Sequence, residues 1–134
     1  MLKSTSRGRD LLAASMLLIV GPFCAPSIAQ DDAGQVLFNN SCRTCHTLDA
    51  GDNRLGPTLH GIVGRKAGAS PDYPFSDAMR KSGLTWDEAT LDRFIADPQA
   101  VVPGNNMKPY GGMAAADDRA KIVAFLKAQG GAAQ

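Results

Sequence analysis

The chain has 134 residues, of which 44% are hydrophobic and 20% charged, the proportions of one folded domain rather than of a disordered protein. Its 14 basic and 13 acidic residues give a formal net charge of +1, which argues against a nucleic-acid-binding protein that neutralises phosphates. Three cysteines are too few for a small disulfide-rich scaffold.

Residues 1–29 have the pattern of a secretory signal peptide. Basic residues stand near the start, an apolar run follows from Leu11 to about Ala25, and small residues occupy positions 27 and 29. We expect cleavage near Ala29. Residues 30–134 would then form a single exported domain, which we expect in a bacterial periplasm.

Other interpretations of this segment fit less well. The apolar run is shorter than the roughly 20 residues of a membrane-spanning helix, and Gly21-Pro22 interrupts it. A lipoprotein signal would use Cys24, but the bulky Phe23 precedes it where a small residue is usual. A mitochondrial transit peptide would lack a continuous apolar run. We therefore expect no stable membrane insertion of the mature chain.

The remaining chain is predicted to consist of helices joined by long loops. Asp31 or Asp32 can cap a first helix that runs to about Asn40. Residues 47–75 are rich in glycine and proline and show no sustained hydrophobic period, so a loop is expected there. A short helix is predicted around residues 76–82.

A third helix is predicted from a capping box, the pattern in which Thr85 is the N-cap and Glu88 stands three residues later. Its apolar face is formed by Leu91, Phe94 and Ile95.

Residues 98–114 begin with a proline, contain further prolines and glycines, and are expected to be loop. The last helix is predicted from about Ala115 to Gln129, where Gly130-Gly131 end it. Its buried stripe consists of Ile122, Phe125 and Leu126. No segment alternates as a strand does, so the predicted fold class is all-α.

The most informative motif is Cys42-Arg43-Thr44-Cys45-His46, a C-x-x-C-H pattern typical of c-type haem attachment. Residues three apart lie on one face of a helical turn, so both thiols can reach one edge of a porphyrin and form thioethers with its vinyl groups. The adjacent imidazole can then bind the iron. Other interpretations of the motif fit less well. A structural disulfide between the two cysteines would need no adjacent histidine. A thioredoxin-like site needs a βαβ context, which the sequence does not show, and a zinc site needs four ligands, for which the neighbouring Cys45 and His46 are poorly placed.

On these residues the chain resembles a class I cytochrome c of the mitochondrial and bacterial respiratory type. The resemblance covers about residues 33–129. The matching stretches are CRTCH at 42–46, GPTLHGIVGRKAG at 56–68, SDAMRKSGLTW at 76–86 and PGNNM at 103–107. It implies a small fold with crossed N- and C-terminal helices, short helices and long loops around one covalent haem c.

The resemblance also implies the ligands of the iron. His46 would bind from one side, and Met107 of the P-G-x-x-M loop would bind from the other. Met113 is the alternative methionine, while Met79 falls in the predicted short helix. His60 lies near the His46 side of the chain and is interpreted as a structural or surface residue.

Further family roles carry over to matching positions. The carbonyl of Pro57 would accept a hydrogen bond from Nδ1 of His46. Side chains that would bond or neutralise the haem propionates are Arg65, Trp86 and Asn105. A close crossing of the terminal helices would involve Gly34, Phe38 and Phe125.

Three features depart from the family pattern. Phe94 replaces a tyrosine that in many relatives reaches the methionine sulfur, and Phe75 replaces one that bonds a propionate. Tyr73 is a candidate substitute for the second hydroxyl. The loop that follows Met107 is one residue longer than in the mitochondrial type.

An iron closed by two protein ligands predicts an electron carrier and not an enzyme. The alternatives are a haem subunit of a periplasmic oxidoreductase, or an open-haem peroxidase or ligand sensor. The resemblance implies a monomer whose partners are a bc1-type complex and a terminal oxidase, or a periplasmic dehydrogenase. Because only Lys66, Lys81 and Lys108 remain of the lysines that ring the haem edge in mitochondrial relatives, short-range apolar contact with the partner is expected.

Overall fold

The computed structural model describes residues 28–130, with side chains from residue 32 onward. Its helices are α1 (Ile28–Ser41), α2 (Asp77–Lys81), α3 (Glu88–Ala96), α4 (Pro98–Val101) and α5 (Ala116–Gly130). Within this range there is no strand, and one isolated antiparallel bridge joins Lys66 to Thr85. These observations agree with the predicted all-α fold. No helix among the described residues is both long and apolar enough to cross a membrane.

The predicted signal peptide lies, apart from its last two residues, outside the described part of the chain. Its cleavage near Ala29 therefore stays a prediction.

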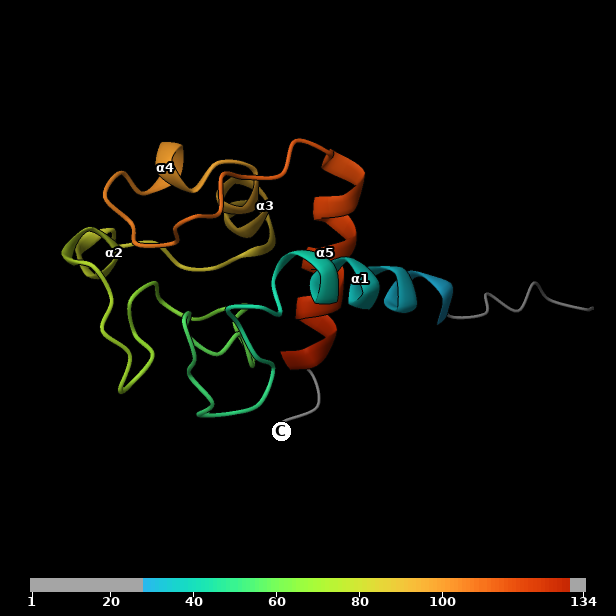
Figure 1. The fold of residues 1–134 in the computed structure, drawn as a ribbon, viewed down its shortest axis with the longest axis horizontal. Coiled ribbons are helices and arrows are strands. Elements are labelled where there is room, and N and C mark those ends of the chain that lie inside the picture. Colours follow the sequence, from blue (N-terminus) through green and yellow to red (C-terminus); the bar gives the residue numbers. More distant parts are fainter. Residues whose placement is uncertain (1–27, 131–134) are drawn as a thin grey trace, which may run out of the picture.

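Helices α1 and α5 cross closely, as Figure 1 shows on the right of the molecule. Gly34 permits the approach, since a Cβ there would lie 2.5 Å from the carbonyl oxygen of Lys121 and 2.7 Å from Cβ of Phe125. The rings of Phe38 and Phe125 pack with centroids 5.7 Å apart. The expected crossing of the terminal helices is thus confirmed, and it joins the two ends of the domain.

Helix α3 packs against α5, and α4 follows α3 directly (Figure 1). The predicted faces are buried: Leu91, Phe94 and Ile95 from α3 point into the same core as Ile122 and Leu126 from α5. The long segment 47–75 contains no helix, as expected. The core is therefore built mainly from α1, α3 and α5, and loops cover the remaining side.

The predicted start of the first helix is wrong. Helix α1 begins at Ile28, upstream of Asp31 and Asp32, so neither aspartate is its N-cap. Acidic residues are favourable throughout the first turn of a helix, and their presence alone does not define its first residue.

The predicted capping box is also wrong. The N-cap of α3 is Asp87, whose carboxylate accepts a hydrogen bond from the Thr90 amide at 2.7 Å. Thr85 cannot serve because it lies in an extended segment paired with residues 64–66, where the Trp86 amide donates to the Arg65 carbonyl at 2.8 Å. A contact with a distant loop thus overrides the local pattern.

The prediction of loop throughout residues 98–114 misses α4. Asp97 caps this single turn by accepting hydrogen bonds from the Gln99 and Ala100 amides at 3.0 Å each. Pro98 occupies the first turn, where its missing N–H is not needed. The short helix α2 agrees with expectation, with Ser76 as its N-cap and Ser82 as its C-cap.

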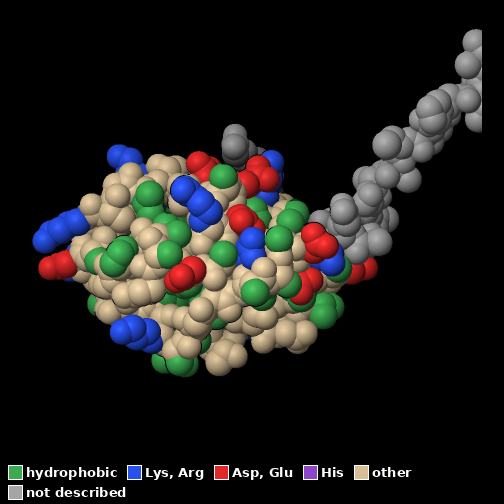
Figure 2. Space-filling model, turned by 90° about the horizontal axis from the view of Figure 1, so that it is seen from above, with side chains coloured by type: hydrophobic (Ala, Val, Ile, Leu, Met, Phe, Trp, Pro, Cys, Tyr) green, Lys and Arg blue, Asp and Glu red, His purple; other side chains and the backbone are tan. Residues whose placement is uncertain are grey.

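The molecular surface carries charges of both signs. Figure 2 shows, from above, Lys and Arg side chains standing apart from one another with Asp and Glu side chains among them. No extended field of one sign covers that face.

Candidate functional site

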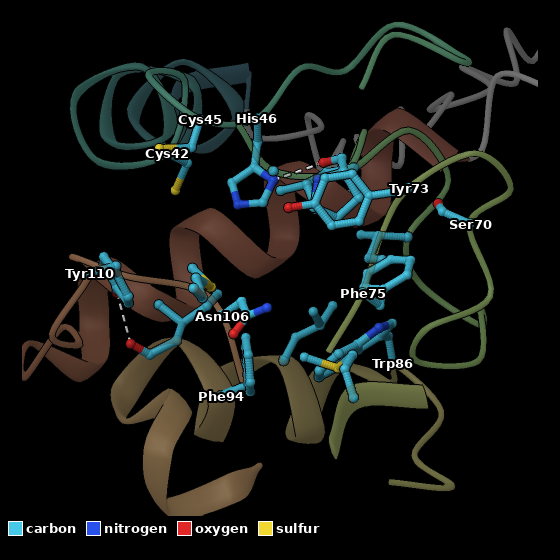
Figure 3. Close-up of a pocket in the computed structure, with 18 of the residues that line it drawn as sticks. Cys42, Cys45, His46, Ser70, Tyr73, Phe75, Trp86, Phe94, Asn106 and Tyr110 are labelled. Atoms are coloured by element: carbon cyan, nitrogen blue, oxygen red, sulfur yellow. Dashed lines mark hydrogen bonds between the residues drawn. The ribbon is translucent and has the colours of Figure 1, made fainter. Parts of the chain in front are cut away.

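A cavity of about 310 Å³ lies between the helices and the long loops. Its wall is mostly apolar, and it is lined by residues from almost every part of the fold. Figure 3 shows Cys42, Cys45 and His46 on one side, with Phe94 and Asn106 across the opening. The apolar lining includes Leu59, Ile62, Phe75, Met79, Trp86, Leu91, Phe94, Ile95, Met107, Ile122 and Leu126.

The two cysteines stand on the turn that continues α1. The amides of Cys45 and His46 both donate to the carbonyl of Cys42, at 3.1 and 3.0 Å, so the motif is wound as a helical turn. Both thiols are free and line the cavity. Burial, with a smaller effect of the neighbouring Cys45, raises the pKa of Cys42 to about 11. The Cys42 sulfur is therefore a protonated thiol at neutral pH.

The imidazole of His46 is buried, with 7% of the residue exposed. Its Nδ1 lies 2.8 Å from the carbonyl oxygen of Pro57, and the ring projects into the cavity (Figure 3). Because a carbonyl can only accept, Nδ1 carries the proton, and Nε2 keeps its lone pair. Burial lowers the pKa of His46, and the bond to Pro57 opposes that effect. The neutral imidazole is the form that can bind a metal.

Gly56 is a site residue that the sequence analysis did not identify. Its amide donates to the Cys45 carbonyl at 2.7 Å. A Cβ at Gly56 would lie only 2.3 Å from Cε1 of His46. The backbone of residues 56–57 therefore both bonds the imidazole and packs against it. The glycine in G-P-x-L-H-G was the available signal.

Met107 lines the cavity from the loop between α4 and α5. The Asn105 side chain shapes this loop: its Oδ1 accepts from the Met107 amide at 2.9 Å, and its Nδ2 donates to the carbonyl of Val102 at 2.9 Å. Asn105 is 4% exposed and is not among the cavity-lining residues, whereas Asn106 is. The Asn105 side chain is thus bonded within its own loop, and its predicted contact with a haem propionate stays a prediction.

Arg65 and Trp86 both line the cavity, as expected for residues that bind a group inside it. One donor of Arg65 is used on the carbonyl of Thr58, at 2.8 Å, and partial burial lowers the pKa of its guanidinium. The Trp86 ring packs edge-on against Phe94 with centroids 4.9 Å apart. These contacts fix both side chains at the cavity wall.

Tyr73 does not present a free hydroxyl to the cavity. Its hydroxyl donates to the carbonyl of Leu55 at 2.7 Å. Its ring packs against the ring of Phe75, with the two centroids 4.7 Å apart. The carbonyl of Leu55 is thus its partner in place of a group in the cavity.

The remaining candidates are placed as follows. His60 does not line the cavity, and its Nδ1 lies 3.1 Å from the Leu48 carbonyl, in agreement with a structural role. Met113 packs against the core outside the cavity lining, so Met107 is the better placed of the two loop methionines. Met79 is buried in the cavity wall.

The sequence did not predict the contacts of two residues that follow Met107. Tyr110 lines the cavity and donates its hydroxyl to the Ile95 carbonyl at 2.7 Å, and burial is the main cause that raises its pKa to about 12. Arg119 bonds Asp92 at 2.9 Å and the carbonyls of Met113 and Ala114 at 2.9 and 2.8 Å. Neither role has a local signature.

The donor set fits a covalently bound haem. Two thiols three residues apart and a neutral imidazole meet at one wall of a largely apolar cavity, and a thioether sulfur is available from Met107. Thiols suit attachment to vinyl groups, while imidazole and thioether sulfur suit iron. Arg65 supplies positive charge at the same cavity.

Comparison of this chain with known protein families and proteins agrees with a haem site. The family model described as "Cytochrome c" matches residues 32–129. The chain is 49% identical to cytochrome c2 iso-2 of Magnetospirillum fulvum, over 64% of this chain and 88% of that protein. It is 44% identical to cytochrome c2 of Rhodomicrobium vannielii, over 73% of this chain and 78% of that protein.

The fold has a solved counterpart as well. Cytochrome cH from Methylobacterium extorquens superposes with a TM-score of 0.67 at 43% identity, covering 73% of this chain and 97% of that chain.

Proposed function

The chain belongs to the cytochrome c family, and from this premise we propose that it is an exported carrier of single electrons with one haem c. The family implies covalent haem c with its iron as the cofactor. When bound, this group supplies a single electron by cycling between Fe(II) and Fe(III). The observation that carries the proposal is the meeting of Cys42, Cys45 and His46 at one wall of an apolar cavity that Met107 also lines.

Each ligand role follows from the chemistry of its side chain. The thiols of Cys42 and Cys45 would form the two thioether links to the haem vinyl groups. Nε2 of His46 and the sulfur of Met107 would bind its iron. The hydrogen bond from Nδ1 of His46 to Pro57 fixes the ring orientation and raises its donor strength.

The haem propionates need partners because buried charge is costly when it is left unpaired. Arg65 and Trp86 line the cavity and are proposed for this role. Asn105 is proposed to order the loop that carries Met107, since its side chain bonds both Val102 and the Met107 amide.

The apolar wall of the cavity suits a haem that transfers electrons without making or breaking covalent bonds. Side chains such as Ile95, Ile122 and Leu126 line the cavity and would exclude water from a haem bound there, and ligation by His46 and Met107 would leave its iron closed to a substrate. Met/His ligation raises the potential of haem iron. The relatives are named cytochrome c2, which agrees with this proposal.

We further propose a periplasmic location and, as partners, a bc1-type complex, a terminal oxidase or a periplasmic dehydrogenase. Because only Lys66, Lys81 and Lys108 remain of the lysines that ring the haem edge in mitochondrial relatives, we propose docking by short-range contact over long-range steering. Leu55, an exposed apolar residue that also lines the cavity, is suited to such contact. A steep dependence of the electron-transfer rate on ionic strength would contradict this docking mode.

The central test is an optical spectrum of holoprotein matured in a periplasm with haem-attachment machinery, recorded oxidised and reduced, with and without carbon monoxide. Sharp low-spin bands, a weak far-red sulfur-to-iron band and no response to carbon monoxide are expected. A high-spin spectrum, or an immediate response to carbon monoxide, would mean an open sixth position and would overturn the carrier.

A further inference from the structure

The loop that carries Met107 is attached unevenly to the rest of the protein. Before Met107 it is fastened by the Asn105 side chain to Val102 and Gln99, both contacts at 2.9 Å. After Met107 comes the sequence Lys-Pro-Tyr-Gly-Gly. Within the described chain, residues 109–112 make one hydrogen bond to the remainder of the molecule, from the Tyr110 hydroxyl to the Ile95 carbonyl at 2.7 Å.

The acceptor of that bond is a carbonyl at the end of α3. In a continuing helix the Ile95 carbonyl would receive the amide of Gln99. Pro98 ends the helix, and the Gln99 amide is taken by the Asp97 carboxylate at 3.0 Å. The Ile95 carbonyl therefore accepts from the loop instead, from Tyr110 and from the Met113 amide at 3.0 Å.

The neighbouring turn of the loop packs on the same helix end. Gly112 has φ +107°, and a Cβ there would lie 2.2 Å from the Ala96 carbonyl oxygen. Arg119 holds the far end of the loop through the carbonyls of Met113 and Ala114. Between Met107 and Met113, Tyr110 is thus the one side chain that ties the loop to α3 by a hydrogen bond among the residues described.

We propose that Tyr110 is a positioning residue that keeps the Met107 loop closed over the cavity. Its ring lines the cavity (Figure 3) while its hydroxyl bonds α3. Loss of the hydroxyl raises the population in which the loop, and with it the sulfur of Met107, moves away. The inference rests on the proposed function, since it assigns Met107 to the iron.

The test measures binding of imidazole to the ferric holoprotein, because imidazole binds only when Met107 has left. Tyr110→Phe keeps the ring and removes the hydroxyl. Imidazole should bind this variant about two- to tenfold more tightly than wild type, the effect of one net hydrogen bond. Hydrogen exchange of the amides in residues 107–113 should accelerate in parallel.

Tyr73→Phe is the matched control. Tyr73 is the other cavity tyrosine, and its hydroxyl also donates to a backbone carbonyl at 2.7 Å, but on the His46 side. The Tyr73→Phe variant should bind imidazole as tightly as wild type does, even if its thermal unfolding midpoint falls. Such a result separates positioning of the loop from general stabilisation of the fold.

The outcomes separate the two proposals. If wild-type holoprotein lacks the far-red sulfur-to-iron band, the assignment of Met107 to the iron fails, and the role of Tyr110 with it, while the electron-carrier proposal is decided by the spin state and the response to carbon monoxide. If wild type has that band, and Tyr110→Phe binds imidazole no more tightly than Tyr73→Phe does, the positioning role of Tyr110 is wrong while the carrier stands.

Discussion

The backbone of Gly56 lies directly against the imidazole of His46: a Cβ at residue 56 would lie 2.3 Å from Cε1, 2.6 Å from Nδ1 and 2.9 Å from Nε2. These distances are shorter than any ordinary contact between carbon or nitrogen atoms. The next residue, Pro57, supplies the carbonyl that accepts from the same ring. One short backbone segment thus determines both the position and the orientation of the proposed ligand.

Gly56→Ala should displace the imidazole of His46. The added methyl cannot be accommodated unless the ring or the loop moves, and overpacking of this kind typically costs about 1–3 kcal/mol. We expect a lower free energy of unfolding of the holoprotein and weaker low-spin bands. Gly130→Ala is the control, since the nearest atom to its Cβ is at 3.4 Å, an ordinary contact. Equal spectra for the two variants would contradict the role of Gly56.

Phe94→Tyr should raise the reduction potential. Phe94 lines the same cavity as Met107 and is buried beside Trp86. A hydroxyl that donates to the methionine sulfur withdraws electron density from the iron and favours Fe(II). Potentiometric titration of the holoprotein measures the effect. An unchanged midpoint potential would show that the new hydroxyl does not reach the sulfur.

Gly34→Ala should destabilise the crossing of α1 and α5. Alanine favours a helix by up to about 1 kcal/mol over glycine, but its methyl would overlap the Lys121 carbonyl at 2.5 Å. We expect a net loss of about 1–2 kcal/mol in urea-induced unfolding. Gln35→Ala, on the exposed side of α1, should stay within about 0.5 kcal/mol of wild type. A Gly34→Ala variant as stable as Gln35→Ala would show that α1 and α5 can shift apart to accommodate the methyl group at little cost.

Asp87 should contribute to acid sensitivity. The hydrogen bond from the Thr90 amide is the main cause that lowers the pKa of its carboxyl below the ordinary 3.8. Because the folded pKa is the lower one, the stabilisation is fully present above the unfolded pKa and is lost as pH falls through the folded pKa. Asp87→Asn should therefore flatten the dependence of unfolding free energy on pH below about pH 5.

Asp87→Ala provides the comparison for that experiment, since it removes the acceptor as well as the charge. It should be less stable than Asp87→Asn at neutral pH. If wild type and Asp87→Asn lose stability equally on acidification, the cap does not govern the acid response.

Much of the fold follows from local patterns. The apolar stripes of α3 and α5 and the caps Ser76 and Ser82 of α2 depend on residues a few positions apart, so they can be predicted without tertiary contacts. One error arises where a distant partner intervenes: Thr85 pairs with Lys66 and cannot cap α3.

The sequence by itself determined the C-x-x-C-H motif and, apart from α4, the presence of the helices, because the spacing of Cys42, Cys45 and His46 and the periodicity of apolar residues are local properties of the chain. Only the tertiary structure decided which residues support that chemistry. Gly56 meets His46, and Tyr110 meets Ile95, through contacts between segments that lie apart along the chain. Such contacts depend on how the helices and loops pack in space, and no local pattern records them.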